Sequence, residues 1–139
     1  MRYIVKNLRD TKKIAKKIKK RLNSVDIICL DGDLGAGKTT FTKYLLRCLG
    51  VKDIVSSPTF TIARQYTARD KMMYHFDLYR IKESKELDEI GFAEMLSNAN
   101  LSIIEWPEIA REYFENYNVL NISISFDQED NRVFEIGEA

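Results

Sequence analysis

Residues 25–39 read VDIICLDGDLGAGKT, and this stretch decides the fold. The apolar run at 25–30 is rich in β-branched residues, which favours a buried strand of a parallel sheet. A glycine-rich loop follows at 32–39, and from Lys38 to Leu49 the apolar residues recur at the spacing of a helix. Gly50 comes next, where a helix C-terminus favours glycine. The stretch therefore predicts a strand, a loop and a helix in direct succession.

The loop at residues 32–39, called the phosphate loop below, matches the phosphate-binding pattern G-x-x-x-x-G-K-[ST]. Gly32 and Gly37 allow a tight turn, so that backbone N–H groups and the helix N-terminus point at an anion. Lys38 is expected to contact the β- and γ-phosphates, and the Thr39 hydroxyl to bind Mg²⁺. A turn that only caps a helix is disfavoured, because a strand precedes the loop and a helix follows it. The predicted nucleotide-binding residues of this segment are Asp33, Leu34, Gly35, Ala36, Gly37, Lys38, Thr39 and Thr40.

Two carboxylates stand at the ends of later apolar strands, where ligands bind in parallel sheets. Asp77 follows residues 73–76, and Glu105 follows residues 102–104. Glu105 is a candidate to bind Mg²⁺ directly or through water, and Asp77 either to do the same or to orient the attacking water. Taken alone, each is equally well explained as a solvated strand end. With the phosphate loop they give a predicted catalytic set of Lys38, Asp77 and Glu105, and predicted metal ligands Thr39, Asp77 and Glu105.

Several other polar residues receive simpler interpretations. Asp31 is interpreted as a turn residue rather than a ligand. His75 is placed in mid-strand, off the face of Asp77, which favours a packed or hydrogen-bonded side chain over a general base. An arginine finger in cis is open among three candidates, Arg64, Arg80 and Arg132, each of which is otherwise a surface arginine.

The basic run at residues 12–21 carries its lysines around a single apolar stripe. This pattern favours the solvated face of an amphipathic helix, and a contact with RNA or a partner protein stays open. The formal net charge of +1 indicates no global field for nucleic acid or membrane. Cys29 and Cys48 lack metal-ligand spacing and are expected to be reduced, buried thiols. The N-terminus does not resemble a signal peptide, and apolar runs of about 18 residues are lacking, so we expect a cytoplasmic protein without membrane contact.

The remaining segments complete a three-layer α/β prediction. Expected helices cover residues 10–22, capped by Asp10 or Thr11, 84–96 with a break near Gly91, and 109–117. Expected strands cover 3–5, 60–66, 71–78, 101–104, 119–126 and 133–136, with 60–66 and 71–78 as an antiparallel pair. At 139 residues and 45% hydrophobic composition the chain can bury one core, so residues 1–139 are predicted to form a single P-loop NTPase-like domain with a mixed sheet.

Five segments together resemble the TsaE family, formerly called YjeE, whose members are bacterial ATPases of tRNA threonylcarbamoyladenosine biosynthesis. The segments are GDLGAGKTTF at 32–41, SPTFT at 57–61, HFDLYR at 75–80, EIG at 89–91 and IEWPE at 104–108. They occur in the family's order and spacing across residues 11–132. This combination is far more specific than the phosphate loop alone.

The resemblance implies a role for several residues. Thr39 and Glu105 would lie on the side of the nucleotide where Mg²⁺ binds, and Asp77 would lie near the γ-phosphate. The residues expected near the nucleotide are Thr11 and Arg132, and those expected to respond to its state are Thr59 and Trp106. The family acts with TsaB and TsaD, which transfer a threonylcarbamoyl group to an adenosine of tRNAs that read codons beginning with A. Family members bind ATP and hydrolyse it to ADP to sustain that complex, so tRNA is met indirectly.

Other functions are weighed against this one. The main alternative is a nucleotide-gated binding module, in which ATP orders residues 57–61 and hydrolysis is incidental. A small-molecule kinase needs an acceptor pocket and a lid, for which 139 residues leave little chain. A GTPase is disfavoured because the sequence has no Asn-Lys-x-Asp segment. Hydrolysis is expected to be slow alone and raised by partners, since no arginine finger in cis is assured.

Overall fold

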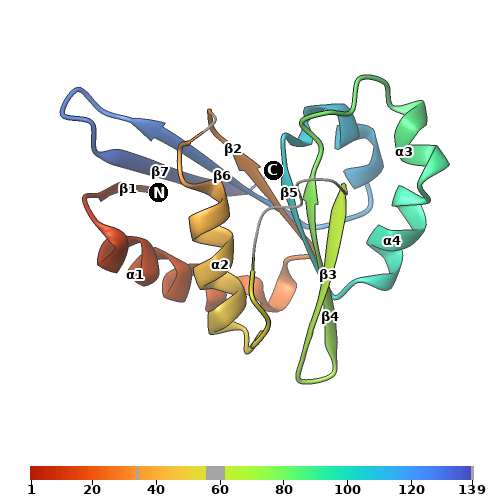
Figure 1. Ribbon diagram of the computed structural model, residues 1–139, viewed down its shortest axis with the longest axis horizontal. Helices are drawn as coiled ribbons and strands as arrows, with labels where there is room; N and C mark the ends of the chain where they lie inside the picture. The colour runs from red at the N-terminus through yellow and green to blue at the C-terminus, as the bar shows by residue number, and fades with distance from the viewer. Residues whose placement is uncertain (34, 56–61, 139) are drawn as a thin grey trace.

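The structure is a computed structural model that describes residues 1–33, 35–55 and 62–138 (Figure 1). Its centre is a seven-stranded sheet with the strand order β1-β7-β6-β2-β5-β4-β3. The strands are β1 (Arg2–Val5), β2 (Ile27–Asp31), β3 (Ala63–Ala68), β4 (Lys71–Asp77), β5 (Leu101–Glu105), β6 (Val119–Phe126) and β7 (Arg132–Glu138). The helices are α1 (Leu8–Lys19), α2 (Lys38–Cys48), α3 (Lys85–Glu89) and α4 (Phe92–Asn98), with 3₁₀ segments η1 (Leu22–Ser24) and η2 (Pro107–Phe114).

Strands in the middle of the sheet are parallel, and strands toward its edges are antiparallel. β2 pairs in parallel with β5 and β6, and β4 pairs in parallel with β5. β3 pairs antiparallel with β4, β7 with β6, and β1 with β7. The mixed sheet predicted from the sequence is confirmed. Because β2, β4 and β5 run in the same direction, their C-terminal ends meet at one edge of the sheet.

Helices cover both faces of the sheet (Figure 1). α1 and α2 pack on one face around buried side chains such as Ile18 and Phe41. α3, α4 and η2 pack on the other face around side chains such as Phe76 and Phe92. Successive residues of a strand point to opposite faces, so each central strand contributes to both cores. The predicted three-layer α/β architecture is confirmed.

α1 begins earlier than predicted, and its N-cap is Asn7 rather than Asp10 or Thr11. Asn7 has an extended backbone, and its Oδ1 accepts a hydrogen bond of 2.9 Å from the Asp10 N–H. Asp10 instead lies in the first turn, where a carboxylate interacts favourably with the helix dipole. The prediction was wrong because the apolar stripe becomes visible only from Ile14 onward, and it therefore did not mark the first turn.

The segment after β5 is a 3₁₀ helix that begins at Pro107, not the predicted helix at 109–117. Trp106 has a left-handed φ of 56°, and the proline follows at the first helical position, where its missing N–H costs little. The segment still buries Ala110 and Phe114 beneath the sheet, as a helix would. β3 begins at Ala63, and residues 60 and 61 of the strand predicted at 60–66 lie outside the described residues.

The structure tests two further expectations. Both cysteines are free, as predicted. Cys29 is buried, and this burial raises the pKa of its thiol to about 12, whereas Cys48 is only half-buried. In the part of the chain that the structure describes, helices are either too short or too polar to cross a membrane.

Candidate active site

The register of the sheet brings the ends of three strands together. Leu30 of β2 pairs with Glu105 of β5, and Asp77 of β4 pairs with the same glutamate from the other side. The phosphate loop begins at Gly32, directly after β2 ends. Both predicted carboxylates therefore lie at the edge of the sheet from which the loop emerges.

The loop between β2 and α2 has the backbone that close approach of an anion requires. Gly35 and Gly37 have left-handed φ values of 83° and 107°, which favour glycine. A Cβ atom at Gly32 would lie 2.8 Å from the Ile124 carbonyl oxygen of β6, so this position also needs glycine. α2 begins at Lys38, and within the described structure no side chain caps its first N–H groups. The helix N-terminus is therefore available to an anion.

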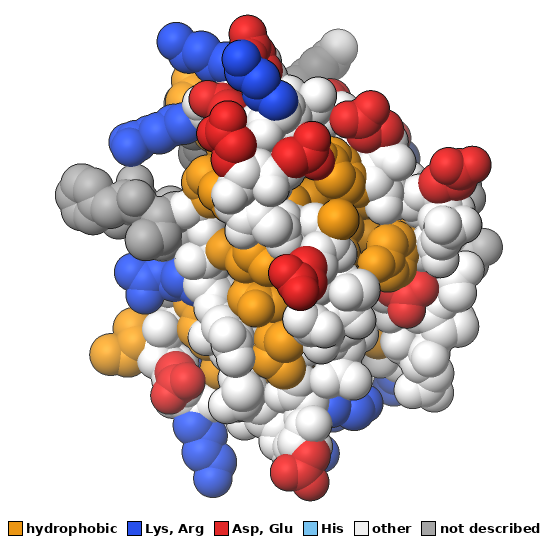
Figure 2. All heavy atoms as spheres, turned by 90° about the vertical axis from the view of Figure 1, so that its right-hand side faces the viewer, with side chains coloured by type: hydrophobic (Ala, Val, Ile, Leu, Met, Phe, Trp, Pro, Cys, Tyr) orange, Lys and Arg blue, Asp and Glu red, His pale blue; other side chains and the backbone are white. Residues whose placement is uncertain are grey.

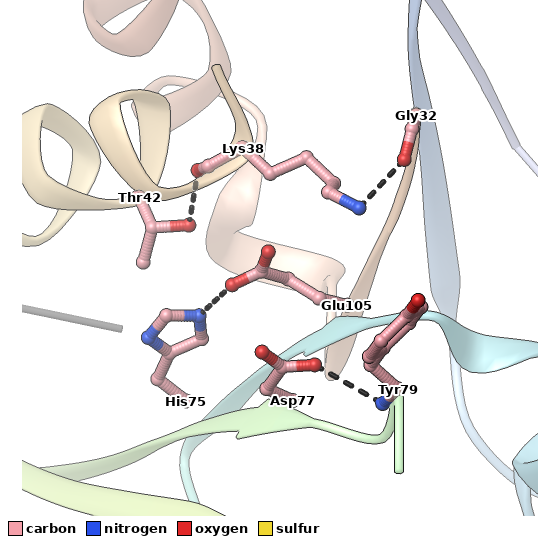
Figure 3. A network of polar contacts seen from close by, with 7 residues as sticks. All are labelled: Gly32, Lys38, Thr42, His75, Asp77, Tyr79 and Glu105. Carbon is pink, nitrogen blue, oxygen red and sulfur yellow. Dashed lines mark hydrogen bonds and ion pairs between the residues drawn. The ribbon is translucent and has the colours of Figure 1, made fainter. Parts of the chain in front are cut away.

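Lys38 reaches back along its own loop to Gly32 (Figure 3). Its Nζ donates a hydrogen bond of 2.6 Å to the Gly32 carbonyl oxygen and lies 3.8 Å from the centroid of the Trp106 ring. Burial lowers the pKa of Lys38, and nearby carboxylates, led by Glu105 and Asp77, oppose this shift. A triphosphate would be a stronger acceptor than the carbonyl, because hydrogen bonds to ionised acceptors are about twice as strong as neutral ones.

Glu105 and His75 form a buried pair on neighbouring strands (Figure 3). The His75 Nε2 and the Glu105 Oε2 lie 2.5 Å apart, and the side chains are 0% and 4% exposed. In the tautomer with Nε2 protonated, the ring N–H donates this hydrogen bond to the Glu105 carboxylate. The other ring nitrogen, Nδ1, is buried and has no hydrogen-bond partner among the described residues. The expectation that His75 is a hydrogen-bonded residue is confirmed, but its partner was not foreseen.

The placement of His75 off the face of Asp77 was wrong. Residues two apart on a strand project to the same face, so both side chains of β4 point toward Glu105 (Figure 3). Asp77 is half-buried, and its Oδ1 accepts a hydrogen bond of 3.1 Å from the Tyr79 N–H. The alternation along β4 was the signal that could have grouped the histidine with the two carboxylates.

Arg132 contacts the phosphate loop from the start of β7. Its Nε donates a hydrogen bond of 2.8 Å to the Ala36 carbonyl oxygen, and its Nη2 donates one of 3.5 Å to that of Gly35. In the described structure neither Arg64 nor Arg80 forms a hydrogen bond or an ion pair with this loop. Beside Arg132 lies a cavity of about 150 Å³, lined by Asn7, Leu8, Thr11, Gly37, Thr40, Arg132 and Phe134. The predicted residues Thr11, Thr40 and Arg132 thus come together next to the loop.

Asp31 is the last residue of β2 and not a turn residue, so its interpretation from the sequence was wrong. Its Oδ2 lies 3.5 Å from Nη2 of Arg111. Burial and a hydrogen bond with Glu108 raise the pKa of Asp31 to about 6, and the same contact lowers the pKa of Glu108. Asp31 thus joins the ends of β2 and η2 at the rim of the site.

The donors at this edge fit magnesium and a triphosphate. Thr39 is half-buried in the first turn of α2. Like Asp77 and Glu105, it carries an oxygen atom of the hard type that Mg²⁺ prefers as a ligand. Among the described residues no three acid, histidine or cysteine side chains form a ready-made metal cluster. Mg²⁺ commonly completes its shell with phosphate and water oxygens, so a few protein donors suffice. Asp33 is exposed in the loop, and two further predicted residues, Leu34 and Thr59, lie outside the described residues.

A glycine-rich loop between a central parallel strand and a helix, with carboxylates at the ends of the adjacent strands, defines a P-loop NTPase-like α/β protein. The sequence profile of one family, described as "Threonylcarbamoyl adenosine biosynthesis protein TsaE", matches residues 5–134. The chain therefore belongs to the TsaE family.

Individual relatives carry the same description. The chain is 43% identical over 109 residues to the TsaE protein of Rickettsia felis, covering 78% of this chain and 63% of the relative. It is 40% identical over 106 residues to that of Bacillus subtilis, covering 76% and 66%. It is 34% identical over 134 residues to that of Rickettsia bellii, covering 96% of this chain and 92% of the relative. The match thus spans slightly less than two thirds of the length of the Rickettsia felis relative.

A solved structure agrees with this assignment. The crystal structure of Bacillus subtilis YdiB is similar to this chain with a TM-score of 0.78 and 32% sequence identity. The similarity covers 100% of this chain and 84% of YdiB. It supports the P-loop NTPase-like fold inferred from the sheet and the loop.

Proposed function

We propose that the protein binds and hydrolyses ATP with Mg²⁺, and that it acts with TsaB and TsaD to form threonylcarbamoyladenosine in tRNA. The observation that carries this proposal is the meeting of Lys38, Asp77 and Glu105 around the phosphate loop, at the ends of β2, β4 and β5. The proposal includes the cytoplasmic location predicted from the sequence. It also includes contact with tRNA through the complex.

The proposed chemistry divides the work among these residues. Lys38 exchanges the Gly32 carbonyl for the β- and γ-phosphates, and the α2 N-terminus adds its N–H groups. Thr39 and Glu105 hold Mg²⁺, which would neutralise charge that develops on the phosphates. Asp77 either joins the metal shell or orients the attacking water. His75 fixes the Glu105 carboxylate in one orientation through its Nε2, so that the glutamate oxygens are pre-organised.

The same contacts support slow hydrolysis by the isolated protein. Nε and Nη2 of Arg132 already donate hydrogen bonds to the Ala36 and Gly35 carbonyls, so in this arrangement the guanidinium is engaged by the loop backbone. A P-loop site without an arginine finger commonly lacks several orders of magnitude in rate. A partner could supply a cation or release Arg132 from the loop. Either route makes turnover dependent on the TsaB and TsaD complex.

A second candidate is a nucleotide-gated binding module, and one contact favours it. The Trp106 ring lies under the Lys38 Nζ and also packs on the ring of Tyr79, with the two ring centroids 5.0 Å apart. Tyr79 is 55% exposed. If Lys38 moves to bind phosphate, the Trp106 ring loses its cation contact, and the exposed tyrosine can change position. The position of an exposed side chain would thereby depend on whether nucleotide is bound, and a partner could recognise the change without hydrolysis.

ATP hydrolysis with and without partners tests the proposal. The purified protein is assayed with Mg²⁺ and ATP, alone and with TsaB and TsaD from the same organism. We expect low turnover alone and a sharp increase with both partners. Equal and negligible rates in both conditions would contradict the ATPase proposal and favour the gated module.

The Glu105→Ala variant separates the two functions further. Loss of the magnesium-side carboxylate should stop partner-stimulated turnover while ATP still binds the loop. Glu112→Ala is a matched control, because Glu112 is an exposed acid on η2. A Glu105→Ala protein that still supports repeated rounds of tRNA modification would show that hydrolysis is incidental.

A further inference from the structure

The outer face of α1 concentrates positive charge. Residues 8–20 contain seven cations and one acid, and the cations are Arg9, Lys12, Lys13, Lys16, Lys17, Lys19 and Lys20. All seven are exposed, because Ile14, Ala15 and Ile18 turn the opposite side of the helix to the core. The one acid, Asp10, lies in the first turn, and its carboxylate accepts a hydrogen bond from the Lys6 N–H. We call these seven cations the α1 basic face.

The α1 basic face has few contacts of its own. Among the described residues, no carboxylate lies within ion-pairing distance of any of its seven cations. Lys12 and Lys17 lie over the rings of Tyr44 and Tyr3, at 5.2 and 4.6 Å from the centroids. Lys13, Lys16 and Lys20 project from the middle of the face. Their charges are compensated by solvent and not by the fold.

This arrangement costs the helix stability. Arg9 and Lys13, Lys12 and Lys16, and Lys13 and Lys17 are like-charge neighbours four positions apart, each destabilising a helix by about 0.2–0.5 kcal/mol. Attraction to the helix dipole offsets this only in the last turn, where Lys16, Lys17 and Lys19 lie. An ordinary solvated face would interleave both signs of charge. Binding of a polyanion would remove the repulsion.

The segment around α3, on the other face of the sheet, is rich in acids. Residues 83–94, which include α3, carry five acids and one lysine. Figure 2 shows this side, with carboxylates spread between apolar side chains and Lys or Arg side chains toward its edges. Because α1 and α3 lie on opposite faces of the sheet (Figure 1), the net charge of +1 conceals a strong asymmetry. The electrostatic field of a polyanion orients such a molecule so that α1 faces the polyanion.

The chemistry of the face identifies the kind of polyanion. A helix that binds lipid inserts its apolar side into the membrane, but the apolar side of α1 is buried against α2 and the sheet. Protein interfaces are anchored mainly by buried aromatic and arginine side chains, and lysine is depleted in them. Contacts from several lysines without an apolar anchor are typical of binding to a phosphate backbone, independent of base sequence.

We propose that the α1 basic face binds the phosphate backbone of tRNA directly. The choice of tRNA rests on the proposed function, which otherwise lets this chain meet tRNA only through its partners. The N-terminal end of α1 contributes Asn7, Leu8 and Thr11 to the cavity beside the phosphate loop. A tRNA bound along α1 therefore lies next to the nucleotide site. The contact is electrostatic and does not discriminate between sequences.

The test measures binding of the full chain to an unmodified tRNA transcript, without ATP, over a range of salt. Each phosphate neutralised contributes about 0.7–0.9 to the slope of log affinity against log salt. The triple variant Lys13→Gln, Lys16→Gln, Lys20→Gln should bind tRNA more weakly and lower that slope by about two to three. A triple variant at exposed lysines elsewhere, Lys52→Gln, Lys82→Gln, Lys85→Gln, changes the net charge equally and should keep the slope within about one of the wild-type value.

Two outcomes would overturn the proposal. Equal losses of tRNA affinity in both triple variants would mean that binding depends only on the net charge of the protein. A loss confined to phosphatidylserine vesicles, with tRNA binding unchanged, would assign the face to a lipid surface. Basal ATP hydrolysis is measured in parallel and should be the same in both variants as in the wild type. If the wild type hydrolyses no ATP even with TsaB and TsaD present, the proposed function fails, while the tRNA result still stands or falls on its own slope.

Discussion

Charge is organised in two different ways at the strand ends of the proposed nucleotide site and on the α1 basic face. At the strand ends charged side chains have specific partners at fixed distances, as Lys38 has in Gly32 and Glu105 has in His75. On α1 seven cations share a surface with no carboxylate partner among the described residues. Buried charges act singly because the low dielectric strengthens each contact, whereas exposed charges are screened and act together. Single substitutions should therefore be decisive in the first region and small in the second.

The largest effect is expected for Lys38→Ala. This change removes a buried cation that is proposed to contact two phosphates, and hydrogen bonds to charged groups are worth about 1.5–3 kcal/mol. We expect ATP affinity to fall by about 10- to 100-fold. Calorimetric titration with Mg²⁺ and ATP measures it. Lys43→Ala, on the same helix, is the control, and an unchanged affinity in Lys38→Ala would remove the basis of the nucleotide site.

The next effect is expected for His75→Ala, which leaves Glu105 buried without its hydrogen-bond donor. An unpaired buried polar group costs about 1–3 kcal/mol, so the free energy of unfolding in urea should fall by that amount. Partner-stimulated turnover should fall more than ATP affinity, because His75 acts through the glutamate. His75→Gln keeps a side-chain N–H donor and should recover part of the turnover. Equal losses in the alanine and glutamine variants would point to packing alone.

A smaller effect is expected from Asp31. Its character is intermediate between the two regions, because its side chain is partly exposed but has charged partners. Its pKa is about 6 in the folded protein, above the ordinary aspartate value, so the folded state holds the proton more tightly than the unfolded state does. Its contribution to stability is therefore present below pH about 4 and lost as the pH rises through about 6. Because the side chain is 33% exposed and the pKa of Glu108 shifts oppositely, we expect only about 1 kcal/mol.

Urea unfolding at several pH values measures this contribution. In the wild type the stability should decline between pH about 4 and 6 by more than in Asp31→Asn, which cannot ionise at this position. Parallel pH profiles for the two proteins would contradict the raised pKa.

The smallest effect is expected on α1, where reversing one charge should stabilise the fold. In Lys13→Glu two like-charge pairs, with Arg9 and Lys17, become opposite-charge pairs, and the glutamate precedes Lys17 in the favourable order. We expect a gain of about 0.5 kcal/mol in the free energy of unfolding, with half of it in Lys13→Gln. Thermal unfolding at low salt checks this gain. A loss of stability would mean that Lys13 has a structural partner.

Local patterns predicted the fold well, and they predicted the residues that meet at the candidate site. The strand, loop and helix at residues 27–48 follow from hydrophobic spacing and glycine positions, and the two carboxylates follow from their place at strand ends. Contacts between distant segments could not be predicted in the same way. The bond from Arg132 to Ala36 and the contact of Lys38 with Trp106 depend on how β7 and the β5 end pack against the loop. Such packing is set by the whole sheet and not by any one segment.

The errors have separate physical causes. Asn7 was missed as the N-cap because the apolar stripe starts about two turns later, at Ile14. His75 was misplaced although alternation along β4 puts it on the face of Asp77, and its bond to Glu105 further required the register of β4 with β5. Asp31 was interpreted as a turn residue because its partners, Arg111 and Glu108, are about 80 residues further along the chain.

A crystal structure with Mg²⁺ and a non-hydrolysable ATP analogue tests the central claim most directly. The account predicts that the analogue's phosphates lie in the loop at residues 32–39, with the Lys38 Nζ moved from the Gly32 carbonyl to the β- and γ-phosphates. It also predicts Mg²⁺ on the side of Thr39 and Glu105. Phosphates bound elsewhere, or a Lys38 that stays on Gly32 and Trp106 while the analogue is present, would contradict it.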